Sequence, residues 1–586
     1  MVRPVATRSL LALALVLATA APAPAGRLVR RTAVTRPAER TRVRPRPSRG
    51  RVRPVRLVNH GRNIRWTPRA AYRPGKDIDE LASLIRQLDR DLPAGATIKA
   101  GGSRHSWSPA AASDGVYIHP EKMKFIEAPA RSELRRDLGG DLVRIGSGTT
   151  IREINRTLWK QGKALPVLGG FDGQTLGGVL PTGTHGSVLA HGPLVDMVQS
   201  IDLVTGDGRK IRLEPEGGIT DPARFRRRDW TLIQDDDAFH AALINMGTFG
   251  VVHSYVLEAT DRFYLNEVRT ATTGADAERV LAGGNIYRIM ETGRPADRRQ
   301  PAALRGFAGH PERAYHLELL WNVASDKMVV TSRQPLNRTR TRALEKDEPA
   351  HFEKSRNRNL LRPFIMKSAH SRPHLTELAA EYLGKPAAAL TNLAARVAPR
   401  LVPRLVDMSL RGLRDTGYTQ RSYNVFNIGD GANRIPAQSA TLSVPLRGDA
   451  YLRAMGVLRT VQREFAAEHK KFQTGPISIR FVKGTRALLG DPEDVAKFEI
   501  IFAGNGKRAQ RLSRELVWRQ YQALHRELGA DVRFHWGQLM PEQFNAVAKQ
   551  RIRESFPAHQ RFEAQRRRFD PHGRFMNRWQ RDILPR

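Results

Sequence analysis

Glycine is concentrated in one short stretch of this chain, and that concentration limits what the surrounding fold can do. Residues 169–187 contain seven glycines in 19 positions, far above the usual share of about 7%. Asp172, Leu176 and Val179 interleave regularly with these glycines, which is not typical of a flexible linker. A backbone with so few side chains can come very close to a flat or charged partner. The stretch therefore predicts a ligand-lining loop, with a flexible glycine-rich loop as the alternative.

A second turn of this kind lies at residues 100–106, directly after a predicted strand. Its glycines, Gly101 and Gly102, let the backbone approach a ligand, and successive N–H groups in such a turn form an anion site that suits a pyrophosphate. His105 would then lie beside the bound anion, whereas the alternative is a plain turn with a surface histidine. For a third turn, residues 247–250, a structural turn and a cofactor wall fit the spacing equally well.

Hydrophobic periodicity predicts an α+β arrangement over the first half of the chain. The spacings Asp77/Glu80 and Thr150/Glu153 are those of capping boxes. Helices are predicted at 77–88, 150–161, 237–245, 512–528 and 559–568, and strands at 96–100, 116–119, 142–146, 200–204, 210–214, 251–257, 316–320 and 441–444. Residues 205–208 predict a hairpin turn, and residues 336–420 predict a helical insertion over the site. No Rossmann fingerprint is present in the sequence.

The N-terminus has the three-part pattern of a secretory signal peptide. Arg3 and Arg8 precede an apolar run at 10–20, and an A-x-A cleavage site follows at 23–25. We therefore expect an exported protein, periplasmic or extracellular, with no membrane span once residues 1–25 are removed; a short N-terminal core helix is the alternative. Residues 26–58 are rich in Arg and Pro and are expected to form a disordered linker.

The composition excludes several kinds of chemistry. The chain has no cysteine, which rules out disulfides, thiolate metal ligands and cysteine nucleophiles. Neither an H-E-x-x-H nor a G-x-S-x-G motif is present, so no metal and no serine hydrolase site are predicted. The net charge is +39, from 97 basic and 58 acidic residues. A polyanion partner and a solvated Arg-rich surface both explain it; the even spread of the charge favours the surface, and no specific nucleic acid is expected.

Taken together and in this order, five segments resemble the vanillyl-alcohol-oxidase-type family of FAD-binding proteins. They are GGSRHS (101–106), TGTHGS (182–187), GTFG (247–250), HWG (535–537) and DPHGRFMN (570–577). Within the family the chain is most similar to the sugar-lactone (D-arabinono-1,4-lactone and L-gulonolactone) and alditol oxidases, strongly over 59–262 and more loosely from about 530.

The resemblance implies an α+β fold with a PCMH-type two-part FAD-binding domain and a mixed α/β substrate (cap) domain. The expected divisions are 59–262 for the FAD domain, 263–542 for the cap domain, and 543–586 for a C-terminal segment that returns to the FAD domain. It also implies that FAD is bound, covalently through His105 and the flavin 8α-methyl carbon; without cysteine, a second covalent link is not available. The implied cofactor-binding residues are Gly101, Gly102, Ser103, Arg104, His105, Ser106, Gly177, Gly178, Thr182, Gly183, Thr184, His185, Gly186, Ser187, Gly247, Gly250, Val251 and Val252.

Two motifs depart from the family pattern. The family's Glu-x-Arg becomes Ser478-x-Arg480, and its His-Trp-Gly-Lys becomes His535-Trp-Gly-Gln538, so one carboxylate and one lysine are lost. We predict oxidation of a CH–OH group of a small sugar or alcohol by hydride transfer to flavin N5, with O₂ as acceptor. Arg480 would stabilise negative charge, and His535 is a candidate general base, with a packed histidine as the alternative. A flavin dehydrogenase with a quinone or cytochrome acceptor, and a secreted polyanion-binding protein without catalysis, are the other hypotheses.

Overall fold

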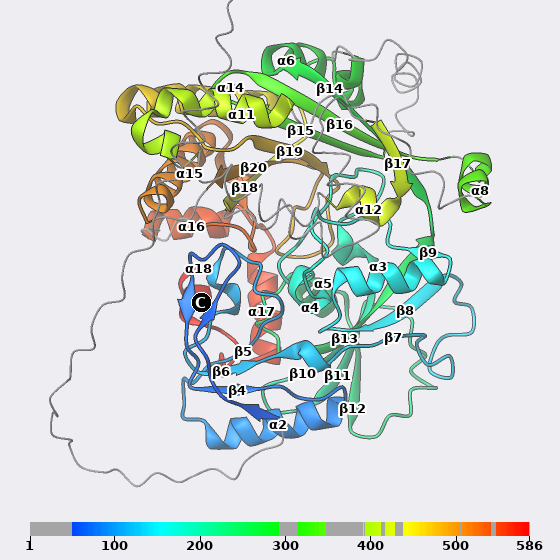
Figure 1. Ribbon diagram of the computed structural model, residues 1–586. Helices are drawn as coiled ribbons and strands as arrows, with labels where there is room; N and C mark the ends of the chain where they lie inside the picture. Colours follow the sequence, from blue (N-terminus) through cyan, green and yellow to red (C-terminus); the bar gives the residue numbers. More distant parts are fainter. Residues whose placement is uncertain are drawn as a thin grey trace, which may run out of the picture. The chain divides into compact units, whose positions relative to one another are not determined.

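The computed structural model describes residues 50–291, 315–336, 338–346, 391, 393–411, 417–427, 437–503, 507–540 and 546–584 (Figure 1). The predicted signal peptide, residues 26–49 of the predicted linker and residues 347–390 of the predicted helical insertion lie outside the described residues. Where that insertion is described, it is helical in α8 (Arg338–Lys346) and α11 (Val402–Arg411). No described helix is both long and apolar enough to cross a membrane.

A small sheet with one covering helix carries the first glycine turn. Its strands, in the order β1-β4-β6-β5, are β1 (Arg51–Val52), β4 (Ala70–Tyr72), β6 (Val116–Ile118) and β5 (Ile98–Ala100), and α2 (Ile78–Asp91) shares its core. Six apolar residues of α2 are buried at helical spacing, which is the pattern of a helix with one face on a core. Because β5 ends at Ala100, the turn that follows starts at the edge of this sheet.

A seven-stranded sheet forms the next layer along the chain. It contains β7 (Ile126–Glu127), β8 (Asp141–Gly146), β9 (Lys163–Ala164), β10 (Val198–Val204), β11 (Lys210–Glu214), β12 (Trp230–Gln234) and β13 (Val251–Asp261). The helices α3 (Ile151–Lys160), α4 (Leu176–Val179) and α5 (Asp236–Leu243) lie between these strands in sequence and share one hydrophobic core with them. The predicted hairpin is confirmed, since β10 and β11 pair antiparallel around residues 205–208.

An eight-stranded sheet from the second half of the chain carries the other wall of the site. In the order β17-β14-β16-β15-β19-β20-β18-β21 its strands are β17 (Gly417–Arg421), β14 (Tyr264–Thr273), β16 (Lys327–Pro335), β15 (His316–Asn322), β19 (Ile477–Val482), β20 (Val495–Ala503), β18 (Ala437–Pro445) and β21 (Arg533–Phe534). Other elements near it are α6 (Gly274–Leu281), α12 (Ser422–Phe426), α14 (Ala450–His469) and α15 (Lys507–Leu528).

The two faces of this sheet differ sharply in polarity. Because successive strand residues point to opposite faces, the apolar residues gather on one face of the sheet and the polar residues on the other. The apolar face includes Leu317, Leu319, Ile477, Ile479, Phe481, Phe498 and Ile500. Tyr451 of α14 contacts Phe481, with ring centroids 6.4 Å apart, so this face lies under the helices. The opposite face carries His316, Glu318, Ser478, Arg480, Lys497 and Glu499.

The C-terminal segment packs back against the first half of the chain. It consists of α16 (Ala546–Glu554), α17 (His559–Phe569) and α18 (Arg578–Ile583). Lys99 of β5, which is 1% exposed, donates hydrogen bonds to the carbonyls of Met246, Gly247 and Phe575 and to Oε1 of Gln580, each 2.9–3.0 Å long. One buried ammonium thus links the first sheet, the 247 turn and the C-terminal segment.

Two details differ from the sequence prediction. Residues 51–58 are not linker, because β1 pairs with β4, β2 (Leu57–Val58) pairs with β3 (Arg65–Trp66), and Leu57 is buried. Backbone pairing of such short strands needs no apolar pattern, so the Arg/Pro-rich composition hid it. At α2, Asp77 accepts the N–H of Asp79, and the predicted reciprocal box with Glu80 does not form. The box at Thr150/Glu153 forms as predicted.

Candidate active site

A cavity lies where the glycine-rich loops meet the polar face of the eight-stranded sheet. Loop residues predicted from the sequence line one wall, namely Gly101 to Ser106, Gly177, Gly178, Thr182, Thr184, His185 and Gly247. Arg480, His535 and Gln538 line the same cavity. Segments more than 400 residues apart in sequence thus converge on one space.

The first two glycines of the 101–106 turn are required by their surroundings. A Cβ at Gly101 would clash with the hydroxyl of Tyr117, and a Cβ at Gly102 would clash with Oγ1 of Thr175. Tyr117 is fully buried on β6, and its hydroxyl donates to the Gly101 carbonyl at 3.0 Å. Only glycine therefore fits at these positions, and the backbone itself forms the cavity wall.

The same turn has the geometry of an anion site. Arg104 adopts a left-handed conformation with φ of 56°, and such a residue among right-handed or extended ones turns several N–H groups toward one side. The hydroxyl of Ser103 donates to the Gly173 carbonyl at 2.9 Å, which holds the first turn against the second glycine-rich loop. The two loops together form a cradle of backbone and small side chains, which fits a dinucleotide cofactor such as FAD.

His105 lies in this cradle with one ring nitrogen unused. Its ring stacks on His60, with centroids 4.1 Å apart, and contacts Phe171 at 4.5 Å. Within the described part of the chain, its buried Nε2 has no hydrogen-bond partner. Burial, with a smaller contribution from His60, lowers the pKa of His105 to about 3. The imidazole is therefore neutral at physiological pH, and in the tautomer with its proton on Nδ1 the Nε2 atom has a lone pair available for bonding.

Arg480 stands on the opposite wall between two carboxylates. Its Nε donates to Oε1 of Glu318 at 3.0 Å, and its Nη2 lies 3.4 Å from Oε2 of Glu499. Burial alone would lower the pKa of this guanidinium, but the two carboxylates raise it above its usual value. Likewise burial would raise the pKa of Glu318, whereas Arg480 and Arg333 hold it well below its usual range. Arg480 and the two carboxylates thus form a buried network of paired charges at this wall.

His535 has both ring nitrogens engaged, which favours the packed histidine over the general base. Its Nε2 lies 2.9 Å from the Gly183 carbonyl, and its Nδ1 accepts the N–H of Gly537 at 3.1 Å. Burial and the charge of Lys497 lower its pKa to about 4. The ring therefore holds the Thr182–Gly183 loop against the strand end. Beside it, Nε2 of Gln538 points to Oε1 of Glu499 at 3.4 Å.

A second, smaller pocket shares part of this lining. Lys497 lies there with His185 and His535, and its ammonium is bound by Asp491 and by the hydroxyl of Ser443. Since that positive charge is already paired, Lys497 does not replace the lysine that the family motif places at position 538. His185 turns its Nδ1 to the Gly186 carbonyl at 2.9 Å, and burial, with Lys497 next, lowers its pKa well below the usual value.

Several predicted site residues do not line the cavity. Ser478 lies on the polar face but outside the lining, and its hydroxyl donates to Glu318 at 2.6 Å. The hydroxyl of Ser187 bonds to the Leu317 carbonyl and accepts the N–H of Phe481, so this residue joins the loop to the sheet. Gly250 serves as the structural turn into β13, because a Cβ there would clash with the Val204 carbonyl. Gly183, Gly186, Val251 and Val252 also lie outside the lining.

Sequence reasoning missed the carboxylates of this site. Glu499 lines the cavity, and Glu318, outside the lining, accepts a hydrogen bond from Arg480. One signal was present: β20 reads VAKFEIIFA, in which Lys497 and Glu499 are the two charged residues of an otherwise apolar strand. Buried charges of this kind are kept only where they are paired.

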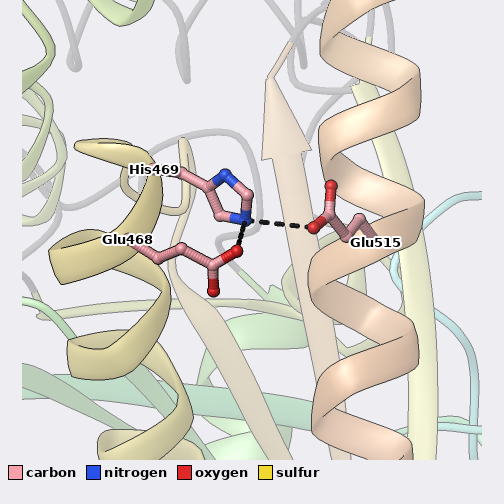
Figure 2. A group of neighbouring side chains, drawn as sticks. All are labelled: Glu468, His469 and Glu515. Carbon is pink, nitrogen blue, oxygen red and sulfur yellow. Dashed lines mark ion pairs between the residues drawn. The ribbon is translucent and has the colours of Figure 1, made fainter.

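A group of possible metal ligands lies elsewhere, between α14 and α15 (Figure 2). Nε2 of His469 lies 3.2 Å from Glu468 and 3.0 Å from Glu515. The guanidinium of Arg519 bonds to the same two carboxylates. A cation is therefore already present, and the group is explained as a surface salt-bridge network.

Comparison with known proteins supports the class that this fold and cavity define. A family model described as FAD binding domain matches residues 68–214, and one described as D-arabinono-1,4-lactone oxidase matches residues 303–583. A cholesterol oxidase from B. sterolicum has a similar fold, with a TM-score of 0.64 and 15% identity over 92% of this chain and 99% of that chain. The class is that of flavoproteins with a PCMH-type FAD-binding domain.

Within that class the chain is similar to the sugar-lactone and alditol oxidases, as its motifs predict. It is 28% identical to an alditol oxidase of Streptomyces sp. over 39% of this chain and 48% of the relative. It is 26% identical to the L-gulonolactone oxidase of Mus musculus over 37% of this chain and 43% of the relative. The chain thus spans about half the length of the curated relatives that it matches.

Proposed function

We propose that this chain is an FAD-dependent oxidase that acts on a CH–OH group of a sugar lactone, a polyol or a related small alcohol. The observation that carries the proposal is the cavity itself, since a glycine-built cradle and a charged wall with Arg480 face the same space. FAD bound in the cradle would accept a hydride from the alcohol carbon and pass the electrons to O₂. The protein's own part is to hold the alcohol, exclude water and stabilise charge on its oxygen.

The cofactor would be held by the loops that the sequence singled out. Gly101–Ser106 would contact the pyrophosphate, Gly177–His185 the second side of FAD, and Gly247 its other end. Arg480 would stabilise the developing negative charge on the substrate oxygen. Names of relatives support the substrate class, because they include an alditol oxidase, L-gulonolactone oxidases and D-arabinono-1,4-lactone oxidases.

A covalent bond from His105 to the flavin 8α carbon is part of the proposal. The buried, unpartnered Nε2 and the pKa of about 3 support it, because a neutral imidazole is the form that can attack carbon. Purified protein is precipitated with acid to test this. Yellow colour should stay in the wild-type pellet and move to the supernatant for His105→Ala; colour released from the wild type would contradict the bond.

Export is the proposal for the N-terminus, on the strength of the signal-peptide pattern at residues 1–25. The N-terminal sequence of protein recovered outside the cytoplasm should begin after Ala25. Recovery of full-length protein in the cytoplasm alone would contradict export.

Anaerobic flavin reduction tests the activity. Holoenzyme is mixed with L-gulonolactone, D-arabinono-1,4-lactone or xylitol, and the flavin absorbance is followed. At least one should bleach it, and air should restore the colour with formation of H₂O₂. A folded yellow protein that none of the three can bleach would contradict the proposed substrate class. Bleaching without return of colour in air would indicate another electron acceptor.

A further inference from the structure

The proposed oxidation requires a group that takes the proton of the substrate hydroxyl, and we infer that this group is Glu499. The assignment rests on the proposed function and deepens it. The candidates from the sequence do not serve: Ser478 is not among the residues that line the cavity, and both ring nitrogens of His535 are engaged. Among the residues that the structure describes, Glu499 is the carboxylate that lines the cavity.

The strand register explains how Glu499 reaches this place. Ser478 of β19 and Glu499 of β20 are direct partners in the antiparallel ladder. The Cβ atoms of such partners lie about 4.5–5.5 Å apart on the same face. A carboxylate at position 499 therefore reaches the same region that a carboxylate at position 478 would reach, on the same face as Arg480. The acid that is missing from the Ser-x-Arg motif is supplied by the neighbouring strand.

The two carboxylates around Arg480 differ in their surroundings. Glu318 is held tightly, by Ser478 at 2.6 Å and by Nε of Arg480 at 3.0 Å, and its side chain is 7% exposed. Contacts of Glu499 are longer, 3.1 Å from the hydroxyl of Ser439 and 3.4 Å from both Arg480 and Gln538, and its side chain is 15% exposed. Glu318 is thus a positioning residue for Arg480, whereas Glu499 has room to exchange partners.

Polar atoms around Glu499 suit a hydroxylated substrate. Oε1 of Gln538, which lines the cavity, is buried and has no hydrogen-bond partner within the described part of the chain. An unpaired buried polar atom costs free energy, and a hydroxyl of a polyol or lactone would satisfy it.

In the proposed step the O–H bond of the substrate would break and its proton would pass to Glu499, while the C–H electron pair would leave as hydride to bound FAD and the C=O bond would form. Arg480 would stabilise the negative charge on the oxygen during this change. Reoxidation by O₂ would consume the hydride and the proton held by Glu499, which together give H₂O₂.

Glu499→Gln tests the assignment, because it keeps the size of the side chain and one oxygen that can accept from Ser439 and Gln538, but it has no carboxylate to take the proton. Wild type, Glu499→Gln, Glu499→Asp and the distant control Glu515→Gln are each mixed anaerobically with the panel compound that reduces the wild type. The limiting rate of flavin reduction should fall about 10²–10⁴-fold in Glu499→Gln, the usual contribution of a general base, and only partly in Glu499→Asp. Glu515→Gln should match the wild type.

A binding measurement separates proton transfer from substrate positioning. The dissociation constant of the same compound, from the concentration dependence of reduction, should change little in Glu499→Gln, and the oxidised flavin spectrum should be unchanged. An unchanged limiting rate, or a loss confined to the dissociation constant, would overturn the role of Glu499 while the wild-type activity stands. Failure of every compound to reduce the wild type would instead overturn the proposed function, and the assignment with it.

Discussion

The two walls of the cavity are built in different ways. One wall consists of short contiguous motifs, residues 101–106 and 169–187, in which neighbouring residues act together through their backbone. The other is built from single residues of different strands: Arg480 from β19 and Glu499 from β20 line it, and Glu318 from β15 supports Arg480. The difference shows that loops built from contiguous motifs can be recognised in the sequence. A wall built from separate strands depends on which strands become neighbours in the fold.

The walls also differ in how they tolerate change. In the wall formed by residues 101–106 and 169–187, the glycine wall, substitution is limited by steric clashes, because added atoms meet buried groups such as the hydroxyl of Tyr117. In the wall that carries Arg480 and Glu499, the sheet wall, substitution is limited by electrostatics, because each buried charge depends on its partners. Four predictions test this contrast.

Arg480→Met should have the largest effect on stability. It leaves Glu318 and Glu499 without their shared cation, and removing one member of a buried ion pair costs about 3–5 kcal/mol. Chemical denaturation should show this loss, while folded protein should still hold flavin because the glycine wall is unchanged. Arg480→Lys should lose less stability, since it retains the charge without the two-pronged geometry. A methionine variant as stable as the wild type would show that the carboxylates do not depend on Arg480.

Gly101→Ala should have a smaller effect on stability, about 1–3 kcal/mol from overpacking, but a strong effect on flavin content. The new methyl group would press on the Tyr117 hydroxyl and deform the turn. The flavin absorbance per amount of folded protein measures the flavin content. Gly139→Ala is the matched control, because no atom lies within 4 Å of the added Cβ there. Equal flavin content in both variants would refute a steric limit at this wall.

Acidification should weaken the sheet wall in two stages. The pKa of His535 is about 4 in the folded protein against an ordinary value of 6.5, so unfolding is favoured progressively as pH falls between these values. The pKa of Glu318 is also lowered, so its stabilisation is present above its ordinary value of 4.5 and is lost as pH falls below it. Unfolding free energies at several pH values should show that Glu318→Gln removes part of the acidic decline. An unchanged slope would contradict the ion pair.

Glu515→Gln should have the smallest effect, because it belongs to neither wall. Its salt bridge lies in the surface network of Figure 2, and exposed pairs contribute about 0–1 kcal/mol. Thermal unfolding should differ little from the wild type, and flavin content should be the same. Loss of flavin in this variant would reveal a connection to the site that its position does not predict.

Local patterns predicted much of the structure. The capping box at Thr150/Glu153, the hairpin at residues 205–208 and the lining role of Gly101 to Ser106 depend on residues close together in sequence. The strand that begins at Arg51 was missed, because its pairing with Tyr72 uses only backbone groups. The same limit hid Glu499, whose neighbour Ser478 is 21 residues away along the chain.

By itself the sequence determined the cofactor side of this protein, since glycines and a histidine in adjacent positions can only build a turn that exposes its backbone. Tertiary structure alone decided the substrate side. There the register of β15, β19 and β20 placed two acids around Arg480, and the Gly183 carbonyl of a distant loop engages Nε2 of His535. The reason is physical: backbone conformation is set by adjacent residues, whereas the neighbours of a buried charge are set by the pairing of distant strands.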